Sequence, residues 1–238
     1  TNSENVTLNG LDINNTAGNK AAVNITDSAG GDMTVNLNNV DANLGDRGLE
    51  VDGSGGSGNF NLNVNDSTFV SNAETGMLFN DIDNGNIDVN NTDVTANGNA
   101  NTAGILISDS DATFDFDNQS DISGATGPSL HVDAGAGTVG HAGEITNDSG
   151  DSILVENLAD GASVTATGAV TGSLGSTGVT VRNNNGGTVV LAGSYELTTG
   201  TNDAVEITGN SDDTDISIGG ITATTTGNGD GFVATGGG

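Results

Sequence analysis

The stretch GMLFNDIDNGNIDVNNTDVTANGNANTAGILI, residues 76–107, decides the fold, because it opens and closes on the same four-residue pattern. GMLF at 76–79 and GILI at 104–107 each place a small residue before two apolar residues that flank a variable position. The two copies lie 28 residues apart. Apolar residues at every second position are typical of a strand with one buried face. Their return at a fixed interval indicates an internal repeat.

The same pattern extends to both sides of this stretch. From Val23 to Phe232, the first apolar residues of successive copies are separated by 23 to 28 residues. Nine copies are found, and they begin at Ala22, Gly48, Gly76, Gly104, Ser129, Ser152, Gly178, Ala204 and Gly231. A second apolar column, with steps of 27 residues and one longer gap, contains Leu8, Val35, Leu62, Val89, Phe116, Val164, Leu191 and Ile218. A third, weaker column contains Ile13, Val40, Val94, Ile145, Val170 and Ile221.

Three alternating stretches per repeat predict an all-β chain that forms a single parallel β-helix over residues 1–238. We expect a right-handed solenoid of about nine rungs, each with about 26–27 residues and three short strands. Asn, Gly and Asp between the stretches suit the tight corners, because these residues accept left-handed backbone conformations. A pair of β-sandwiches is the alternative fold, but it does not explain a period of about 27 residues.

The charge balance excludes whole classes of partner. The 238 residues contain 3 Lys and Arg against 32 Asp and Glu, a formal net charge of −29. Nucleic-acid binding needs a basic surface, and anionic membrane surfaces repel such a chain. No apolar run is long enough for a membrane span, so we expect no membrane insertion. Cysteine is absent, which excludes disulfides and thiolate metal sites.

In these Gly–apolar–x–apolar rungs and in its Cys-free, Asn-, Gly-, Thr- and Asp-rich composition, the chain resembles a known class of proteins. It is similar to the pectin-lyase-like parallel β-helix repeats of secreted bacterial surface proteins, such as autotransporter passengers and filamentous-haemagglutinin-type adhesins. The resemblance covers the whole chain in rung length and style, without a family-defining motif. It implies an extracellular or cell-surface location and a role in a fibre, filament, stalk, sheath or adhesin. The implied partners are other copies of the chain or a fibre or cell-surface protein.

Polysaccharide lyases and hydrolases share this architecture, so carbohydrate binding or degradation is the alternative function. A lyase needs basic groups or calcium at one place, but Arg47 and Arg182 are expected about 24 Å apart, five rungs at about 4.8 Å each. His131 is expected at an outward strand position and His141 in a Gly-rich turn, with no nucleophile pattern around either. We therefore predict a non-catalytic protein that requires no cofactor.

Asp81, Asp83 and Asp88 surround Gly85 and form the candidate metal site. Carboxylates and amides are the oxygen ligands that calcium takes. The spacing is not that of an EF-hand, because Gly85 follows Asp81 by four residues and no Glu closes the loop. Two hypotheses remain: a solvated acidic corner of the repeat, which we favour, or a weak calcium site that offsets repulsion between stacked carboxylates.

The variable position of each four-residue pattern is expected to face solvent. In the middle rungs this outward column contains Leu78, Leu106, His131 and Leu154. Adjacent exposed leucines in so hydrophilic a chain indicate a contact surface for a partner or a second copy. The alternative is that a corner loop covers them.

Neither end of the repeat carries a recognisable cap. The first rung starts near Val6, and the last closes with Phe232 and a Gly-rich tail. Solenoid ends expose strand edges and core, and terminal repeats normally cover them. We therefore expect either further rungs beyond this segment or end-to-end stacking of copies into a filament.

Overall fold

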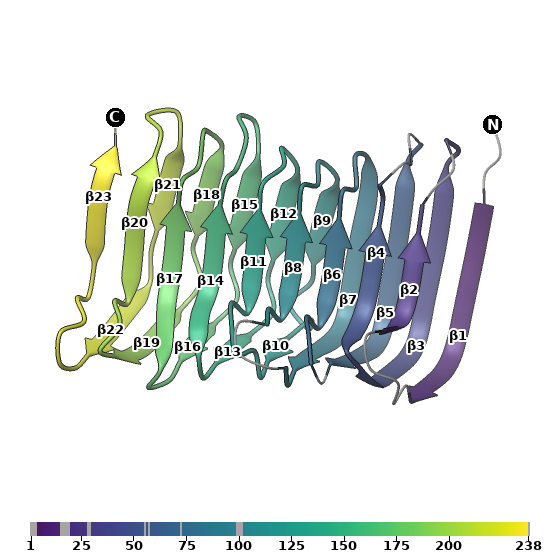
Figure 1. Ribbon diagram of the computed structural model, residues 1–238, viewed down its shortest axis with the longest axis horizontal. Helices are drawn as coiled ribbons and strands as arrows, with labels where there is room; N and C mark the ends of the chain where they lie inside the picture. Colours follow the sequence, from purple (N-terminus) through teal and green to yellow (C-terminus); the bar gives the residue numbers. More distant parts are fainter. Residues whose placement is uncertain are drawn as a thin grey trace.

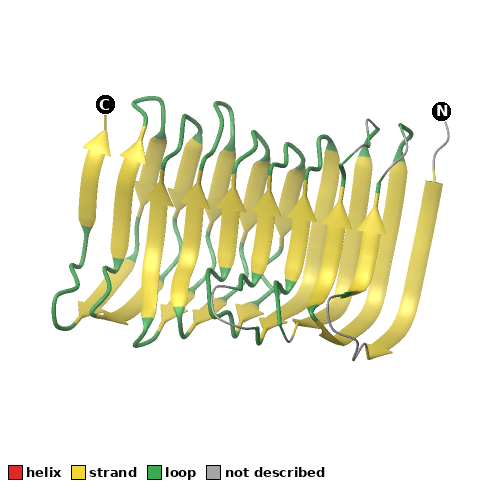
Figure 2. Cartoon of the chain, viewed as in Figure 1, coloured by secondary structure: helices red, strands yellow, loops and turns green. Residues whose placement is uncertain are grey.

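The computed structural model describes residues 4–14, 20–27, 30–54, 56, 58–71, 73–98 and 102–237. These residues form 23 strands and no helix, and the strands stack in parallel through about eight turns of a single right-handed β-helix. Figure 2 shows the strands as yellow arrows joined by loops along two edges of the stack. The predicted all-β solenoid is therefore confirmed. Among the described residues, no helix is long and apolar enough to cross a membrane.

The strands are, in chain order, β1 (Glu4–Asn14), β2 (Ala21–Thr26), β3 (Met33–Gly45), β4 (Arg47–Asp52), β5 (Phe60–Ser71), β6 (Met77–Asn80), β7 (Gly85–Ala96), β8 (Ile105–Ser108), β9 (Thr113–Phe116), β10 (Ile122–Ser123), β11 (Leu130–Asp133), β12 (Thr138–His141), β13 (Ile145–Asn147), β14 (Gly150–Glu156), β15 (Ser163–Ala166), β16 (Val170–Gly172), β17 (Ser176–Arg182), β18 (Thr188–Leu191), β19 (Tyr195–Gly200), β20 (Val205–Asn210), β21 (Asp215–Ile218), β22 (Ile221–Thr225) and β23 (Val233–Gly237).

The nine copies of the opening pattern build one sheet of nine parallel strands. Its order is β2-β4-β6-β8-β11-β14-β17-β20-β23, and these strands lie side by side across the front of Figure 1. Residues at the same place in the pattern pair across neighbouring strands, as Met77 does with Leu49 and with Ile105. The glycine directly before β6 has a steric reason. A Cβ on Gly76 would lie 2.6 Å from the carbonyl oxygen of Gly104 in the next rung.

The other two stretches of each rung belong to a sheet of 14 strands. In the first four rungs they form one long strand, β1, β3, β5 or β7, which bends at a left-handed residue: Gly10, Asn39, Asp66 or Asn91. From β9 onward the same path divides into two short strands, because β7 pairs with β9 along its first half and with β10 along its second. Three strands per rung therefore describe the later rungs, and two describe the earlier ones.

Pairing in this sheet corrects the columns that a step of 27 residues predicts. Leu8 pairs with Leu37, whereas Val35 pairs with Leu62, which in turn pairs with Ile87. The column with steps of 27 therefore crosses between two adjacent inward columns, because the turns differ in length from rung to rung. The third column is confirmed at five of its six predicted places, Ile13, Val94, Ile145, Val170 and Ile221, which stack together with Ala42, Phe69, Ile122 and Tyr195. Val40 is the exception, because Ala42, two residues later, takes its place in the column.

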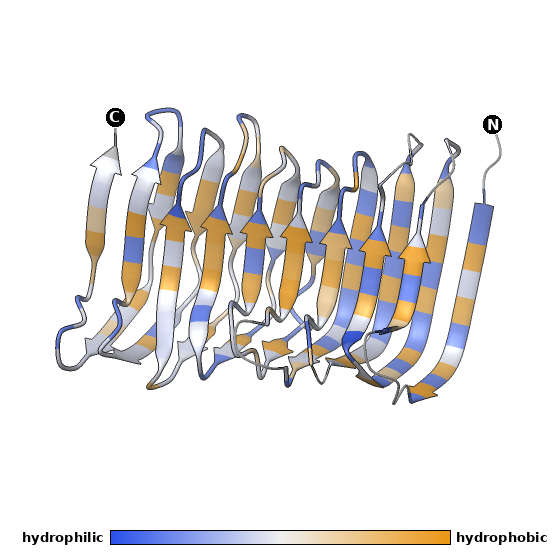
Figure 3. Cartoon of the chain, in the orientation of Figure 1, coloured by the Kyte–Doolittle hydropathy of each residue, from blue (hydrophilic) through white to orange (hydrophobic). Residues whose placement is uncertain are grey.

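The core is a set of stacked apolar columns between the two sheets. Figure 3 shows apolar and polar residues alternating along the strands, as expected for strands with one buried face. Phe79 packs edge-on against Phe114 and Phe116, with ring centroids 5.4 and 6.2 Å apart. Burial of each large side chain contributes about 1.5–3 kcal/mol. An unbroken core along the rod follows from this stacking.

Candidate functional site

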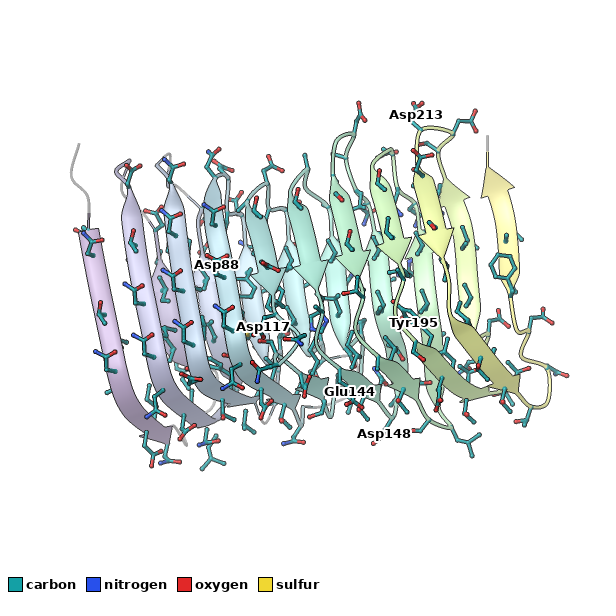
Figure 4. All side chains as sticks on the ribbon, turned by 180° about the vertical axis from the view of Figure 1, so that it is seen from behind. Asp88, Asp117, Glu144, Asp148, Tyr195 and Asp213 are labelled. Atoms are coloured by element: carbon teal, nitrogen blue, oxygen red, sulfur yellow. The ribbon has the colours of Figure 1, made fainter. Side chains whose placement is uncertain are left out.

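The three aspartates of the expected calcium site do not converge. Asp81 and Asp83 lie in the loop between β6 and β7, while Asp88 lies on the outer face of β7, paired with Asn63 and Asp115. Figure 4 labels Asp88 on the outer face of the 14-stranded sheet. Within the described part of the chain, these three carboxylates form no convergent ligand group. The structure therefore does not assemble them into one site, and calcium binding at individual corners stays a prediction.

The acidic corners have a conformational role. In several rungs, the residue directly after the strand of the nine-stranded sheet has a left-handed backbone conformation. The φ angle is 54° at Asp81, 48° at Asp109, 58° at Asn157 and 56° at Asn183. Asp and Asn accept this conformation more readily than other residues with a side chain. The backbone N–H of Asp81 donates a 3.0 Å hydrogen bond to the carbonyl of Ser108 in the next rung. The turn alone thus accounts for Asp at this corner.

The outward column of leucines is in the expected register, but its side chains are less exposed to solvent than expected. Leu78 pairs with Leu106, Leu106 with His131, and His131 with Leu154. The first three are half-buried, and Leu154 is only 4% exposed. Leu154 is therefore not an accessible contact residue. A partner contact at Leu78, Leu106 and His131 stays a prediction.

His131 also belongs to a charged cluster on the outer face of the nine-stranded sheet. Its Nε2 lies 3.0 Å from Oε1 of Glu156 in the next rung. Oε2 of Glu156 accepts a 2.7 Å hydrogen bond from Nε of Arg182, one rung further along. Asp133, two residues after His131, accepts a 2.7 Å hydrogen bond from Nδ2 of Asn157. Strands β11, β14 and β17 thus place both signs of charge side by side.

Two carboxyl groups in this cluster have pKa values shifted in opposite directions. Burial raises the pKa of Asp151, against a 2.6 Å hydrogen bond from Oγ1 of Thr180 and the charges of Arg182 and His131. Burial also acts to raise the pKa of Glu156, but hydrogen bonds from Arg182 and His131 outweigh it, and the net shift is downward. Opposite shifts are a property of acid–base pairs, although structural ion-pair networks produce them too.

Three depressions on the surface of the described residues lie elsewhere. One of about 320 Å³ lies at the C-terminal end, one of about 250 Å³ at the N-terminal end, and one of about 300 Å³ near Asp93, Asp121 and Glu144. None of these three is lined by His131 or Glu156. The charged cluster therefore lies on an outer sheet face, not in one of these three hollows.

Asp133, Asp151 and Glu156 were not identified from the sequence as site residues. A second outward column, two residues after the leucine column, contains Asp133, Glu156 and Arg182 in successive copies of the pattern. The structure pairs these residues in register. Alignment of that second column would have revealed the cluster.

The expectation for His141 is wrong. This residue does not lie in a turn: it closes β12, points inward and is 2% exposed. It pairs with Phe116 on one side and Ala166 on the other, and its ring centroid lies 5.7 Å from that of Phe116. His141 therefore occupies an apolar core column.

Aromatic side chains that could stack on a sugar are scarce on the surface. Of the six Phe and one Tyr in the sequence, only Phe232 is exposed, and it lies in the last rung. The other six are buried. The middle rungs therefore present no exposed Phe or Tyr side chain on which a sugar ring could stack.

No family model, curated protein or solved structure matches this chain. The parallel β-helix therefore rests on the structure and on the repeat pattern.

Proposed function

We propose that this chain is a segment of an extracellular structural or adhesive fibre, stalk or sheath, and that its rungs are extended end to end by further β-helical rungs, either of a longer chain or of other copies. This role corresponds to that of the repetitive regions of autotransporter passengers and filamentous-haemagglutinin-type adhesins. It is a non-catalytic role that requires no cofactor.

The observation that carries the proposal is the state of the two terminal rungs. Val6 and Phe232 occupy the first and last places of core columns, and they are 37% and 60% exposed. The depression at the N-terminal end is lined by core residues that include Leu8 and Val23. The one at the C-terminal end includes Ile207 and Ile216.

Strand edges support the same proposal. Within the part of the chain that the structure describes, β1 pairs only with β3 and β2 only with β4 at one end, while β21, β22 and β23 each pair with a single neighbour at the other. Unpaired edges are templates for another strand. A contact between the first rung of one copy and the last rung of another is heterologous, and such contacts lead to open-ended assemblies.

The extracellular part of the proposal rests on the resemblance to secreted bacterial surface proteins, in rung style and in a Cys-free, Asn-, Gly-, Thr- and Asp-rich composition. A carbohydrate-binding or carbohydrate-degrading protein is the weaker candidate, because the aromatic side chains of the middle rungs are buried.

Light scattering over a range of protein concentration, in calcium-containing buffer, tests this proposal. We expect the mass to rise above the 23.3 kDa of one chain as concentration increases. Val6→Asp and Phe232→Asp each place a charge on a terminal core column and are expected to abolish this growth. Thr113→Asp, which adds the same charge on an outward position in the middle of the rod, is the matched control. A constant mass of 23.3 kDa at every concentration would contradict self-stacking.

A further inference from the structure

The group His131, Asp133 and Glu156 combines one imidazole and two carboxylates on adjacent strands. Asp133 of β11 pairs in register with Glu156 of β14, and His131 precedes Asp133 by two residues on the same face. One ligand atom from each residue lies within 4.8 Å of those of the other two. Among the described residues, this is the single group of three such side chains with that convergence.

Neighbouring donors hold the two carboxylates in place. The hydrogen bond from Asn157 takes Oδ1 of Asp133, and the hydrogen bond from Arg182 takes Oε2 of Glu156. Each carboxylate therefore keeps its second oxygen for another partner, and in Glu156 that oxygen already faces Nε2 of His131. Outer hydrogen bonds that orient the ligands are a general feature of metal sites in proteins.

Burial and charge favour a cation at this place. The side chains of His131 and Glu156 are 17% and 13% exposed, so water screens their charges only in part. Asp133 and Glu156 together bring two carboxylates to the group, and a divalent ion offsets their negative charge. Arg182 adds one positive charge nearby, and it interacts electrostatically with Asp151 and Glu206 as well as with Glu156.

We propose that His131, Asp133 and Glu156 bind a divalent transition-metal ion, with Zn²⁺ as the representative. A mixed set of imidazole nitrogen and carboxylate oxygen suits Zn²⁺, Mn²⁺, Fe²⁺ or Co²⁺, whereas Ca²⁺ and Mg²⁺ take oxygen ligands. Three protein ligands leave a coordination position open to water. This site is distinct from the acidic corners and is independent of the proposed structural role.

Isothermal titration of the full chain with Zn²⁺ tests this proposal, in the presence of millimolar Ca²⁺ and Mg²⁺ to occupy the many other carboxylates. We expect one equivalent to bind to the wild type. His131→Gln and Asp133→Asn are each expected to weaken this binding by about tenfold or more, since each removes one of three ligands. Co²⁺ added to the wild type is expected to give visible d–d absorption bands, which both variants lose.

His141→Leu is the matched control, because it removes the other histidine without touching the cluster, and it should bind as the wild type does. Melting curves in chelator show whether each variant is folded. If one of the two ligand variants does not fold, the other still tests the site. The proposal is overturned if the wild type binds no equivalent of Zn²⁺ under these conditions. It is equally overturned if folded His131→Gln and Asp133→Asn bind Zn²⁺ as tightly as the wild type.

Discussion

His141 is a titratable residue in an apolar core column, between Phe116 and Ala166. Neither ring nitrogen has a hydrogen-bond partner among the described residues. Burial lowers the pKa of His141 to about 4, and the nearby Asp117 opposes this only in part. The folded protein thus keeps His141 neutral, whereas the unfolded chain protonates it at an ordinary pKa of about 6.5.

This difference predicts a loss of stability in acid. Above pH 6.5 His141 is neutral in both states and contributes no pH dependence. As the pH falls from about 6.5 to about 4, only the unfolded chain takes up the proton, so the free energy of unfolding falls by about 3 kcal/mol. Below about pH 4 this contribution levels off.

Urea unfolding of the wild type and of His141→Leu at a series of pH values measures this effect. All other ionisable groups are the same in both proteins, so the difference between the two isolates His141. We expect the stability of His141→Leu relative to the wild type to increase as the pH falls from 6.5 to 4. A difference that does not change with pH would show that His141 does not couple folding to protonation.

At the scale of the element, the long strands of the first four rungs carry a ladder of asparagines on their outer face. Asn38 donates to Asn9, Asn65 to Asn38 and Asn90 to Asn65, over 2.8, 3.0 and 3.2 Å. Figure 4 shows the side chains of this face standing in rows across the strands. The ladder requires the same residue at the same place in successive rungs. The stacked asparagines therefore stabilise strand pairing on the solvent face of the sheet, as the apolar columns do on its core face.

Asn65→Asp tests the ladder. The new carboxylate still accepts the hydrogen bond from Asn90. It cannot donate to Asn38, however, so a carboxylate oxygen faces Oδ1 of Asn38. We expect a loss of about 0.5–1.5 kcal/mol of stability, the net value of a hydrogen bond. Urea unfolding at neutral pH measures it.

Asn43→Asp is the control, because it adds the same charge on β3 at a residue whose side chain forms no hydrogen bond with another described residue. Equal losses in the two variants would assign the effect to charge alone and contradict the ladder.

At the scale of the whole molecule, the rod carries a net charge of −29. Adjacent rungs lie about 4.8 Å apart, so carboxylates at corresponding positions repel each other. Salt shortens the range of this repulsion, since the screening length falls from about 30 Å at 0.01 M to about 8 Å at 0.15 M. Both screening and bound cations are therefore expected to stabilise the fold.

The melting temperature is expected to rise with added NaCl, and to rise further in millimolar calcium than in NaCl of the same ionic strength. The additional rise follows from calcium bound between carboxylates at the corners. The same melting temperature with calcium and with chelator, at matched ionic strength, would remove the calcium hypothesis and leave screening alone. A melting temperature that does not depend on salt would contradict repulsion as a destabilising force.

The sequence by itself determined the solenoid, because each rung buries too little apolar surface alone and must place like residues against like in the next rung. Nine copies of one pattern therefore predicted nine stacked strands and the register of their sheet, including the outward column that contains Leu78 and Leu106. The acidic corners were also predictable as turns, since Asp and Asn are the residues with side chains that best accept the left-handed conformation.

Only the tertiary structure decided what depends on the lengths of individual turns. Because the rungs differ in length, a constant step of 27 residues misaligned Leu8 with Val35, which pairing separates. The Gly-rich surroundings of His141 predicted a turn, whereas pairing places this residue in the core. In the nine-stranded sheet, the repeat pattern already places Asp133 against Glu156, and the structure adds that ligand atoms of His131, Asp133 and Glu156 lie within 4.8 Å of one another. The alignment of neighbouring strands decides which side chains meet across rungs. Where the turns differ in length, that alignment is set by the packing of the whole stack.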